Sequence, residues 1–279
     1  MFIITLTAIP SRFGHLRHVL TPLLEQNRPA DRVILYIPKS YRRFPDWDGA
    51  LPAVPEGVEI RRCEQDFGPA TKVLPAVREF SGEDLDILFC DDDRHYEPDW
   101  TEPFLKARET HPRAAIASSF LNLPNFGLPP RAAPPGPRAR RLPRLLDLKY
   151  RARRLAPLLR GDGYAQDRKD KPSRREVWRS GHGDTFQGYG GVLVRPEFFP
   201  QAAFDIPKEG WAVDDIWLSG LLAANGIPIW VVKDATRQRT TEMQREAALH
   251  LATIDGANRA EANKRCALFL QREFGVWCD

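Results

Sequence analysis

Residues 85–93 of the chain read LDILFCDDD, a short apolar run that ends in three consecutive aspartates. The apolar part predicts a buried strand, because it has the length of a strand and is rich in branched and aromatic side chains. Adjacent carboxylates repel one another at neutral pH, so such a triplet usually needs a cation or a set of hydrogen-bond donors to compensate it. The stretch therefore predicts a buried strand whose carboxyl end carries Asp91, Asp92 and Asp93.

Similar apolar runs recur along the chain and alternate with helical patterns. The predicted strands cover residues 2–8, 32–38, 58–63, 85–90, 114–119, 190–195 and 227–232. The predicted helices cover residues 12–26, 71–80, 98–110, 214–224 and 241–274. This alternation predicts an α/β fold with a mostly parallel central sheet and helices on both faces. In such sheets, ligands bind at the carboxyl ends of the strands.

A segment at about residues 121–183 interrupts the pattern. It begins with five prolines within residues 129–137, which exclude helix and central strand. It continues into residues 142–159, LPRLLDLKYRARRLAPLL, where leucines and basic residues share an expected amphipathic helix. We expect one catalytic domain over residues 1–279, with this segment as an insertion and residues 241–279 as a helical tail.

The charge of the chain is unevenly distributed. Residues 131–179 contain 16 Lys/Arg and 5 Asp/Glu, a net charge of +11, so the remaining residues carry −7 of the total of +4. One interpretation is docking to an anionic membrane or a phosphorylated, lipid-linked glycan. The other is a solvated flexible loop. Nucleic-acid binding is disfavoured, because the segment has few aromatic residues and no recognisable module.

The composition is that of a globular protein, with 42% hydrophobic and 28% charged residues. No apolar run approaches the roughly 20 residues that cross a bilayer. The four cysteines lie far apart, without the spacing of a zinc site or a redox motif, and the sequence has no Asn-x-Ser/Thr acceptor. We expect a cytoplasmic protein, either free or peripheral at the inner face of the membrane.

The aspartate triplet has two interpretations. Its carboxylates suit Mg²⁺ or Mn²⁺, with diphosphate oxygens and water completing the coordination. Alternatively, it is a solvated acidic turn before the next helix, since aspartate is common in turns. Its position directly after a predicted strand favours the metal site.

Residues 66–72, DFGPATK, form a second polar cluster after a predicted strand. Gly68 allows close approach of the backbone to a ligand, and the start of the following helix offers N–H groups to a phosphate. Lys72 adds a positive charge for the phosphate, and Asp66 has the acceptor oxygens for a base or a ribose. The alternative is a structural Gly-Pro turn.

Two further motifs lie in the second half of the chain. Residues 188–193, GYGGVL, indicate a backbone that passes close to a ligand or to another packed element, or a simple hairpin turn. Residues 211–220, WAVDDIWLSG, place Asp214 and Asp215 at a predicted helix start. Acidic residues there are favoured by the helix dipole, and they are also well placed for a general base. Spacing alone does not decide between these alternatives.

Together, and in this order, the motifs resemble those of bacterial glycosyltransferases with the GT-A fold, the family-2-like nucleotide-diphospho-sugar transferases. The shared phrases are D-x-G-P-A-T-K, D-D-D-x-x-Y-x-P, G-Y-G-G-V-L and D-D-I-W-L-S-G, here at residues 66–72, 91–98, 188–193 and 214–220. Residues 4–12, ITLTAIPSR, also match the first nucleotide-contacting loop of GT-A enzymes. The resemblance covers most of the chain outside residues 121–183.

The resemblance implies a role for each matching residue. Asp91 and Asp93 correspond to the Asp-x-Asp positions that bind the metal, Asp215 to the catalytic base, and Asp214 to a residue that orients the acceptor or supports Asp215. The donor-binding positions are Thr7, Arg12, Asp66, Gly68, Lys72, Asp91, Asp92, Gly190 and Gly191. His250, the single histidine of the tail, is expected on a helix surface and is not counted as a metal ligand.

The implied function is a metal-dependent glycosyltransferase that moves a sugar from a nucleoside diphosphate to an acceptor hydroxyl, with inversion if Asp215 is the base. The resemblance also implies Mn²⁺ or Mg²⁺ as cofactor, a glycan or lipid-linked glycan as acceptor, and a role in polysaccharide biosynthesis. A sugar-1-phosphate nucleotidyltransferase is an alternative, but residues 7–15 lack its glycine-rich basic loop. A non-catalytic module that binds anionic glycans is the other alternative.

Overall fold

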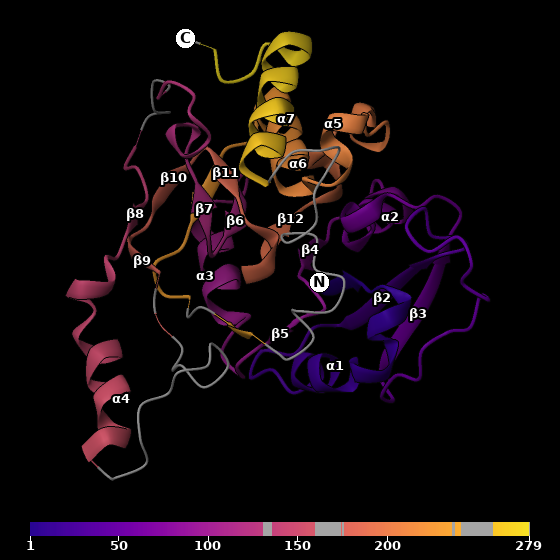
Figure 1. Ribbon diagram of the computed structural model, residues 1–279, viewed down its shortest axis with the longest axis horizontal. Helices are drawn as coiled ribbons and strands as arrows, with labels where there is room; N and C mark the ends of the chain where they lie inside the picture. Colours follow the sequence, from indigo (N-terminus) through magenta and orange to yellow (C-terminus); the bar gives the residue numbers. More distant parts are fainter. Residues whose placement is uncertain (131–135, 160–173, 175, 236–237, 241–258, 279) are drawn as a thin grey trace.

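The computed structural model describes residues 1–130, 136–159, 174, 176–235, 238–240 and 259–278 (Figure 1). Its centre is an eight-stranded sheet with the strand order β10-β13-β6-β12-β4-β1-β2-β3. The strands are β1 Phe2–Thr7, β2 Arg32–Pro38, β3 Val58–Cys63, β4 Asp86–Phe89, β6 Ala115–Ala117, β10 Gly181–Gly183, β12 Val192–Val194 and β13 Ile229–Val231.

The sheet is mixed, with most of its strands in one direction. β1 is parallel to β2 and β4, β2 is parallel to β3, and β6 is parallel to β13. β12 lies between β4 and β6 and is antiparallel to both, so β4 and β6 share one direction. β10 is antiparallel to β13 at the edge. The predicted α/β fold with a mostly parallel sheet is confirmed.

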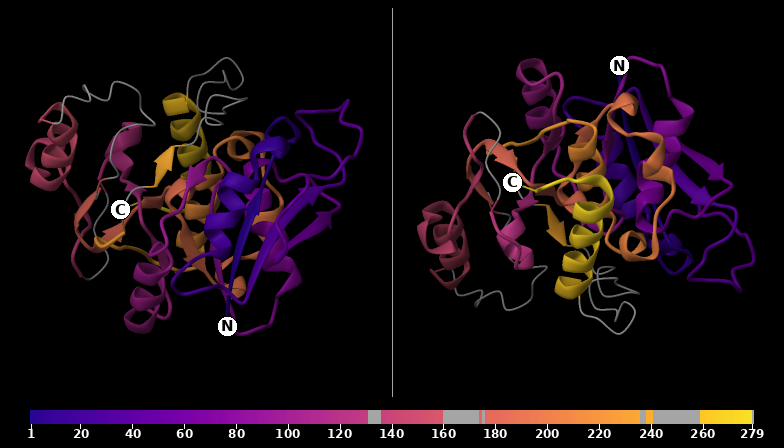
Figure 2. Two further views of the ribbon diagram at one scale, coloured as in Figure 1. Left: turned by 90° about the horizontal axis from the view of Figure 1, so that it is seen from below. Right: turned by 90° about the horizontal axis from the view of Figure 1, so that it is seen from above.

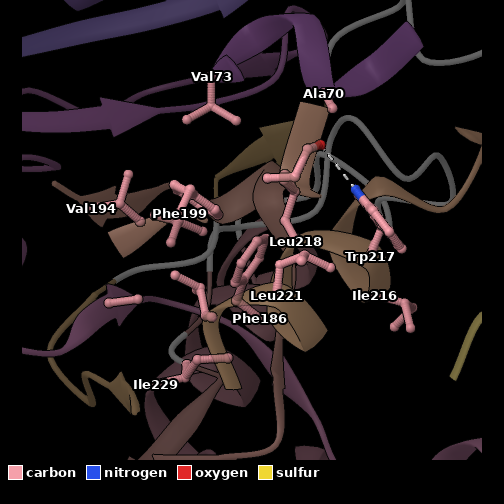
Figure 3. Packing of buried hydrophobic residues seen from close by; sticks show 14 of the residues in the cluster. Ala70, Val73, Phe186, Val194, Phe199, Ile216, Trp217, Leu218, Leu221 and Ile229 are labelled. Atoms are coloured by element: carbon pink, nitrogen blue, oxygen red, sulfur yellow. Dashed lines mark hydrogen bonds between the residues drawn. The ribbon is translucent and has the colours of Figure 1, made fainter. Parts of the chain in front are cut away.

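Helices cover both faces of the sheet. Neighbouring strand residues alternate between two hydrophobic layers: Ile3 belongs to one and Ile4 to the other. The first layer contains α2 Leu74–Glu79, α6 Asp214–Ala224 and α7 Arg259–Phe274, and the second contains α1 Arg17–Leu24 and α3 Glu102–Thr110. Figure 3 shows part of the first layer, where Trp217 of α6 donates its indole N–H to the carbonyl oxygen of Ala203 over 3.2 Å.

Short elements complete the fold. Three two-stranded pairs join β5 Arg94–His95 to β14 Arg239–Thr240, β7 Phe120–Leu121 to β11 Thr185–Phe186, and β8 Arg140–Arg141 to β9 Val177–Arg179. The remaining α-helices are α4 Leu148–Leu159 and α5 Lys208–Trp211. Single 3₁₀ turns span Pro10–His15, Gly68–Lys72, Leu123–Phe126, Arg144–Leu146, Gly188–Gly190, Pro196–Phe198 and Gln201–Phe204.

Several predicted helices are shorter in the structure than their hydrophobic patterns indicated. The predicted helix 71–80 is a 3₁₀ turn that ends at Lys72, followed by α2 with Pro75 in its first turn, where the missing N–H costs nothing. The helix predicted at 12–26 likewise begins with a 3₁₀ turn, and α1 starts at Arg17. Of the predicted tail helix, residues 259–274 are helical as α7, and residues 241–258, with His250, lie outside the described residues.

The two ends of the predicted insertion belong to the fold. Leu121 lies in β7, which pairs with β11, and β10 extends the central sheet at residues 181–183. The strand pairing thus includes both ends of the segment at about 121–183, and its assignment as an insertion stays a prediction. Between these ends, α4 projects away from the sheet at one side of the molecule (Figures 1 and 2). No helix in the described part of the chain is both long and apolar enough to span a bilayer.

Candidate active site

A cavity of about 660 Å³ lies at the carboxyl ends of β1, β3 and β4. Its wall also includes the first turn of α6 and the beginning of α7. Ten of the predicted site residues line it: Thr7, Arg12, Asp66, Gly68, Lys72, Asp91, Asp92, Asp93, Asp214 and Asp215. The structure thus brings together residues from three of the predicted motifs and from the loop after β1. They meet at the carboxyl ends of the strands, where a ligand site is expected in such a sheet.

Lys72 is a buried cation of this cavity, with 4% of its surface exposed. Its Nζ lies 2.7 Å from Asp91 Oδ1, 3.0 Å from Asp214 Oδ2 and 4.0 Å from Asp215 Oδ1. Burial opposes the charge, but the carboxylates outweigh it and raise the pKa of Lys72 well above its usual value. One ammonium group therefore joins the end of β4 to the start of α6.

Gly188 is the residue that lets the backbone approach this ion cluster. Its N–H donates to Asp215 Oδ1 over 3.0 Å. A Cβ atom at this position would lie 2.6 Å from Lys72 Nζ and 2.9 Å from Asp215 Oδ1. The first glycine of the GYGG motif is thus required by the cluster itself.

Arg12 compensates the other two aspartates of the triplet. It lies in the 3₁₀ turn after β1, and its Nη1 is 2.5 Å from Asp92 Oδ1 and 3.7 Å from Asp93 Oδ2. Arg94 Nε lies 3.3 Å from Asp93 Oδ1. The triplet is therefore not a solvated turn, because each of its carboxylates faces a cation from a different part of the chain.

The carboxyl groups of the cavity differ in their pKa. Burial, with the neighbouring Asp93 and Asp91, raises the pKa of Asp92 to about 7. Burial and Asp214 raise the pKa of Asp215 to about 7 as well. Burial also acts against ionisation of Asp91, but the Lys72 ammonium overcomes it and lowers the pKa of that carboxyl. The cavity thus holds a firmly ionised carboxylate beside two that titrate near neutrality.

The rest of the wall contains residues that the sequence motifs did not single out. They include the rings of Tyr41, Phe44, Tyr189 and Trp211, the cations Arg43, Arg94 and Arg259, and the amides Asn125, Gln187 and Asn263. Tyr189 lies inside the GYGG motif, and Trp211 is the first residue of the WAVDDIWLSG stretch that contains Asp214 and Asp215. Their position in these motifs was the available signal. Gly68, at φ +59°, packs against the Trp211 ring.

Asp66 holds its own loop. Its Oδ1 accepts the N–H of Gly68 and its Oδ2 accepts the N–H of Arg42, each over 2.8 Å. The carboxylate therefore fixes the loop after β3 against the loop after β2. Its predicted contact with the donor stays a prediction.

Gly190 and Gly191 are not part of the cavity wall. The carbonyl oxygen of Gly190 accepts the indole N–H of Trp100 over 2.9 Å. Gly191 has φ +98°, and a Cβ there would lie 2.6 Å from the Trp100 ring. Packing against Trp100 explains Gly191, whereas a Cβ at Gly190 would lie 2.1 Å from the Ser118 hydroxyl oxygen. The predicted donor contact of both glycines stays a prediction.

The carboxylates of the cavity wall suit a divalent cation whose coordination is completed by a bound diphosphate. The described lining residues comprise six aspartates and five Lys/Arg, so the wall is slightly acidic, and a diphosphate would add further negative charge. No group of three or more His, Cys, Asp or Glu side chains in the described part of the chain is arranged to hold a metal. Mg²⁺ commonly takes one or two carboxylates and completes its coordination with substrate phosphates and water. Asp91 and Asp93 offer such a pair.

The first prediction concerns Lys72. Lys72→Met leaves buried carboxylates without their cation, so we expect the free energy of unfolding to fall by about 3–5 kcal/mol. Urea denaturation followed by circular dichroism measures the change. The control is Lys39→Met, which removes an exposed ion pair with Glu64 and should cost less than about 1 kcal/mol. Equal losses in the two variants would contradict the role assigned to Lys72.

The second prediction concerns the pH dependence of stability at Asp215. Its pKa of about 7 in the folded protein exceeds the ordinary value of 3.8, so its ionisation destabilises the fold as the pH rises through this window. Asp215→Asn removes this titration and keeps an acceptor for the Gly188 N–H. We expect the variant to gain stability over the parent between about pH 4 and pH 7, at up to about 1.4 kcal/mol per pKa unit.

Urea denaturation in the presence of a chelator, at pH 5 and at pH 8, measures the difference in the free energy of unfolding between Asp215→Asn and the parent. The gain should be larger at pH 8. A gain that is the same at both pH values, or a loss of stability at pH 8, would show that Asp215 does not carry a raised pKa.

No protein-family model and no curated protein matches the chain. Solved structures with a similar backbone include residues 1–349 of TarS from S. aureus in complex with UDP, at 15% identity and a TM-score of 0.46, covering 99% of this chain and 72% of that one. The same protein in complex with UDP-GlcNAc has 16% identity and a TM-score of 0.47, covering 98% and 72%. The TarS crystal structure without a stated residue range has 14% identity and a TM-score of 0.43, covering 98% and 43%.

Proposed function

We propose that the protein is a glycosyltransferase of the GT-A type that moves a sugar from a nucleoside diphosphate donor to an acceptor hydroxyl. The observation that carries the proposal is the single ion cluster at the carboxyl ends of the strands. There, Lys72 lies between Asp91 on one side and Asp214 on the other, 2.7 and 3.0 Å from their oxygens. A candidate diphosphate site and a candidate base thus share one cavity.

The donor side of the cavity is formed by the loops after β1 and β3. Thr7 and Arg12 come from the first loop, and Gly68 brings the second loop against Trp211. The aromatic rings of the wall offer apolar surface to a nucleobase, and Arg43 offers positive charge to the phosphates. These features support a nucleoside diphosphate as the donor.

Asp91 and Asp93 are the residues that we assign to a divalent cation, Mn²⁺ or Mg²⁺. Bound there, the cation would neutralise charge on the departing diphosphate. Lys72 adds positive charge beside Asp91. Arg12 holds Asp92, and the role of Asp92 is therefore to fix the triplet.

Asp215 is our candidate for the general base, with Asp214 as its supporting neighbour. The Gly188 N–H fixes one oxygen of Asp215 within the cavity wall. Its carboxylate would take the proton of the acceptor hydroxyl, the acceptor oxygen would bond to the anomeric carbon, and the bond to the diphosphate oxygen would break with its electron pair. A base on the face opposite the diphosphate gives inversion of configuration.

The acceptor side carries hydrogen-bonding side chains suited to a hydroxyl-rich molecule. Tyr189 and Gln187 line the cavity, and the Ser119 hydroxyl lies 3.0 Å from both the Tyr189 hydroxyl and Gln187 Oε1. This lining supports a glycan or a lipid-linked glycan as the acceptor, as in polysaccharide synthesis.

The third prediction tests the donor and the cation together. In a thermal-shift panel of nucleotide sugars, we expect one class to raise the melting temperature in the presence of Mn²⁺ and to do so much less without it. Asp91→Asn and Asp93→Asn should abolish the Mn²⁺-dependent part, whereas Asp84→Asn, at an exposed acid outside the cavity, should keep it. Stabilisation by a nucleoside triphosphate with a sugar 1-phosphate instead would indicate a nucleotidyltransferase.

The fourth prediction separates transfer from donor binding. With the donor found in the panel, Asp215→Asn should slow transfer to the acceptor by about 10²–10⁴-fold, since it removes a positioned base. Calorimetric affinity for the donor should stay within a few-fold of the parent. Asp205→Asn, at an exposed position, is the control. Near-normal transfer by Asp215→Asn would rule out its role as base.

A further inference from the structure

The exposed hydrophobic side chains of the protein are concentrated in one projecting region. This region, the basic arm, comprises residues 140–157 and 176–179, that is β8, the 3₁₀ turn Arg144–Leu146, most of α4, and β9. Among the described residues, eight large hydrophobic side chains are exposed, and five of these lie in the basic arm: Leu145, Leu146, Leu148, Leu155 and Trp178. Such a cluster marks an interaction surface rather than ordinary scatter.

Leu148 and Leu155 of α4 share one face of the helix, and that face is open to solvent. Leu148, Ala152 and Leu155 follow the i, i+4, i+7 spacing of a single stripe. Leu148 is 73% exposed and Leu155 49% exposed. In a helix that covers a protein core, a hydrophobic stripe of this kind is buried against the core, whereas in α4 it is exposed. Figure 2 shows from two sides that α4 stands away from the sheet and its covering helices.

Positive charge surrounds the leucine stripe. Residues 140–155 contain seven Lys/Arg and one acid, Asp147, a net charge of +6. Lys149, Arg151 and Arg153 are exposed. Asp147 is buried, with its Oδ2 3.6 Å from Arg174 Nε, so it faces inward and leaves the outer surface basic. The chain outside residues 131–179 carries a net −7, so the excess positive charge of the sequence is concentrated in this segment.

The basic arm is joined directly to the cavity wall. Arg141 of β8 donates from Nη2 to Gln187 Oε1 over 3.2 Å. Tyr189 donates its hydroxyl to Glu176 Oε2, next to β9, over 2.8 Å. Gln187 and Tyr189 both line the cavity. The base of the arm is therefore fixed to residues of the cavity wall.

We propose that the basic arm docks on an anionic lipid bilayer. The leucines of the 3₁₀ turn and of α4 enter the interface between headgroups and acyl chains, and the flanking arginines and lysine contact the lipid phosphates. A nucleic acid would use the charge but not the leucines, and it favours aromatic stacking surfaces, which this arm offers only at Trp178 and Tyr150. The proposal stands apart from the sugar transfer, because lipid binding needs none of the cavity residues.

Co-sedimentation of the full chain with vesicles tests the proposal. At low salt, we expect binding to phosphatidylcholine vesicles that contain phosphatidylglycerol, and none to phosphatidylcholine alone. Arg151→Gln combined with Arg153→Gln should weaken binding about 25-fold, at about fivefold per charge. Leu155→Asp should weaken it about tenfold or more.

Each control variant makes the same change as an arm variant, at a residue outside the arm with a similar exposure or the same charge. Leu51→Asp, at a side chain 48% exposed, matches Leu155→Asp, and Arg17→Gln combined with Arg113→Gln matches the arginine pair. Both should bind vesicles like the parent. No binding to the anionic vesicles would overturn the proposal. Binding that Leu155→Asp weakens by no more than the about fivefold of a single charge would also overturn it, because a polyanion site responds only to the charges.

Discussion

The arrangement of the site depends on one buried ammonium group, that of Lys72. Its contacts with Asp91 and Asp214 connect the end of β4 to the start of α6, two segments far apart in the sequence. Burying a lysine is costly unless carboxylates surround it, and burying those carboxylates is costly without the lysine. The cluster therefore forms as a whole. The Gly68–Lys72 turn carries the lysine, and Gly188 leaves free the space that a Cβ would take beside Lys72 and Asp215.

This arrangement leaves the cavity with more carboxylate than the fold itself can compensate. Asp92 and Asp215 both have a pKa near 7, because burial and neighbouring acids disfavour their charged forms. A core built only for stability would replace such groups with apolar residues. Retaining them costs stability, and this cost is expected where a ligand or a proton is to be exchanged.

Much of the fold, and part of the site, was accessible from sequence. β2 and β3 match the predicted runs because each is a short apolar or branched segment bounded by turn residues. The aspartates could be placed at a strand end, but the pairing of Lys72 with Asp214 depends on tertiary packing that no local pattern contains. The glycines show the same limit: Gly188 faces the ion cluster, whereas Gly191 faces Trp100, and in sequence both are glycines of one motif.

The basic arm shows why a helical pattern does not reveal which side is buried. The leucine spacing of residues 148–155 predicts an amphipathic helix, and by itself it suggests that the leucines face the protein. In the structure, Asp147 turns inward to Arg174 and the leucines turn outward. The arm's strands meanwhile hold Gln187 and Tyr189 through Arg141 and Glu176. Because hydrogen bonds connect the arm to the cavity wall, the orientation of the arm on a surface also fixes the orientation of the cavity toward that surface.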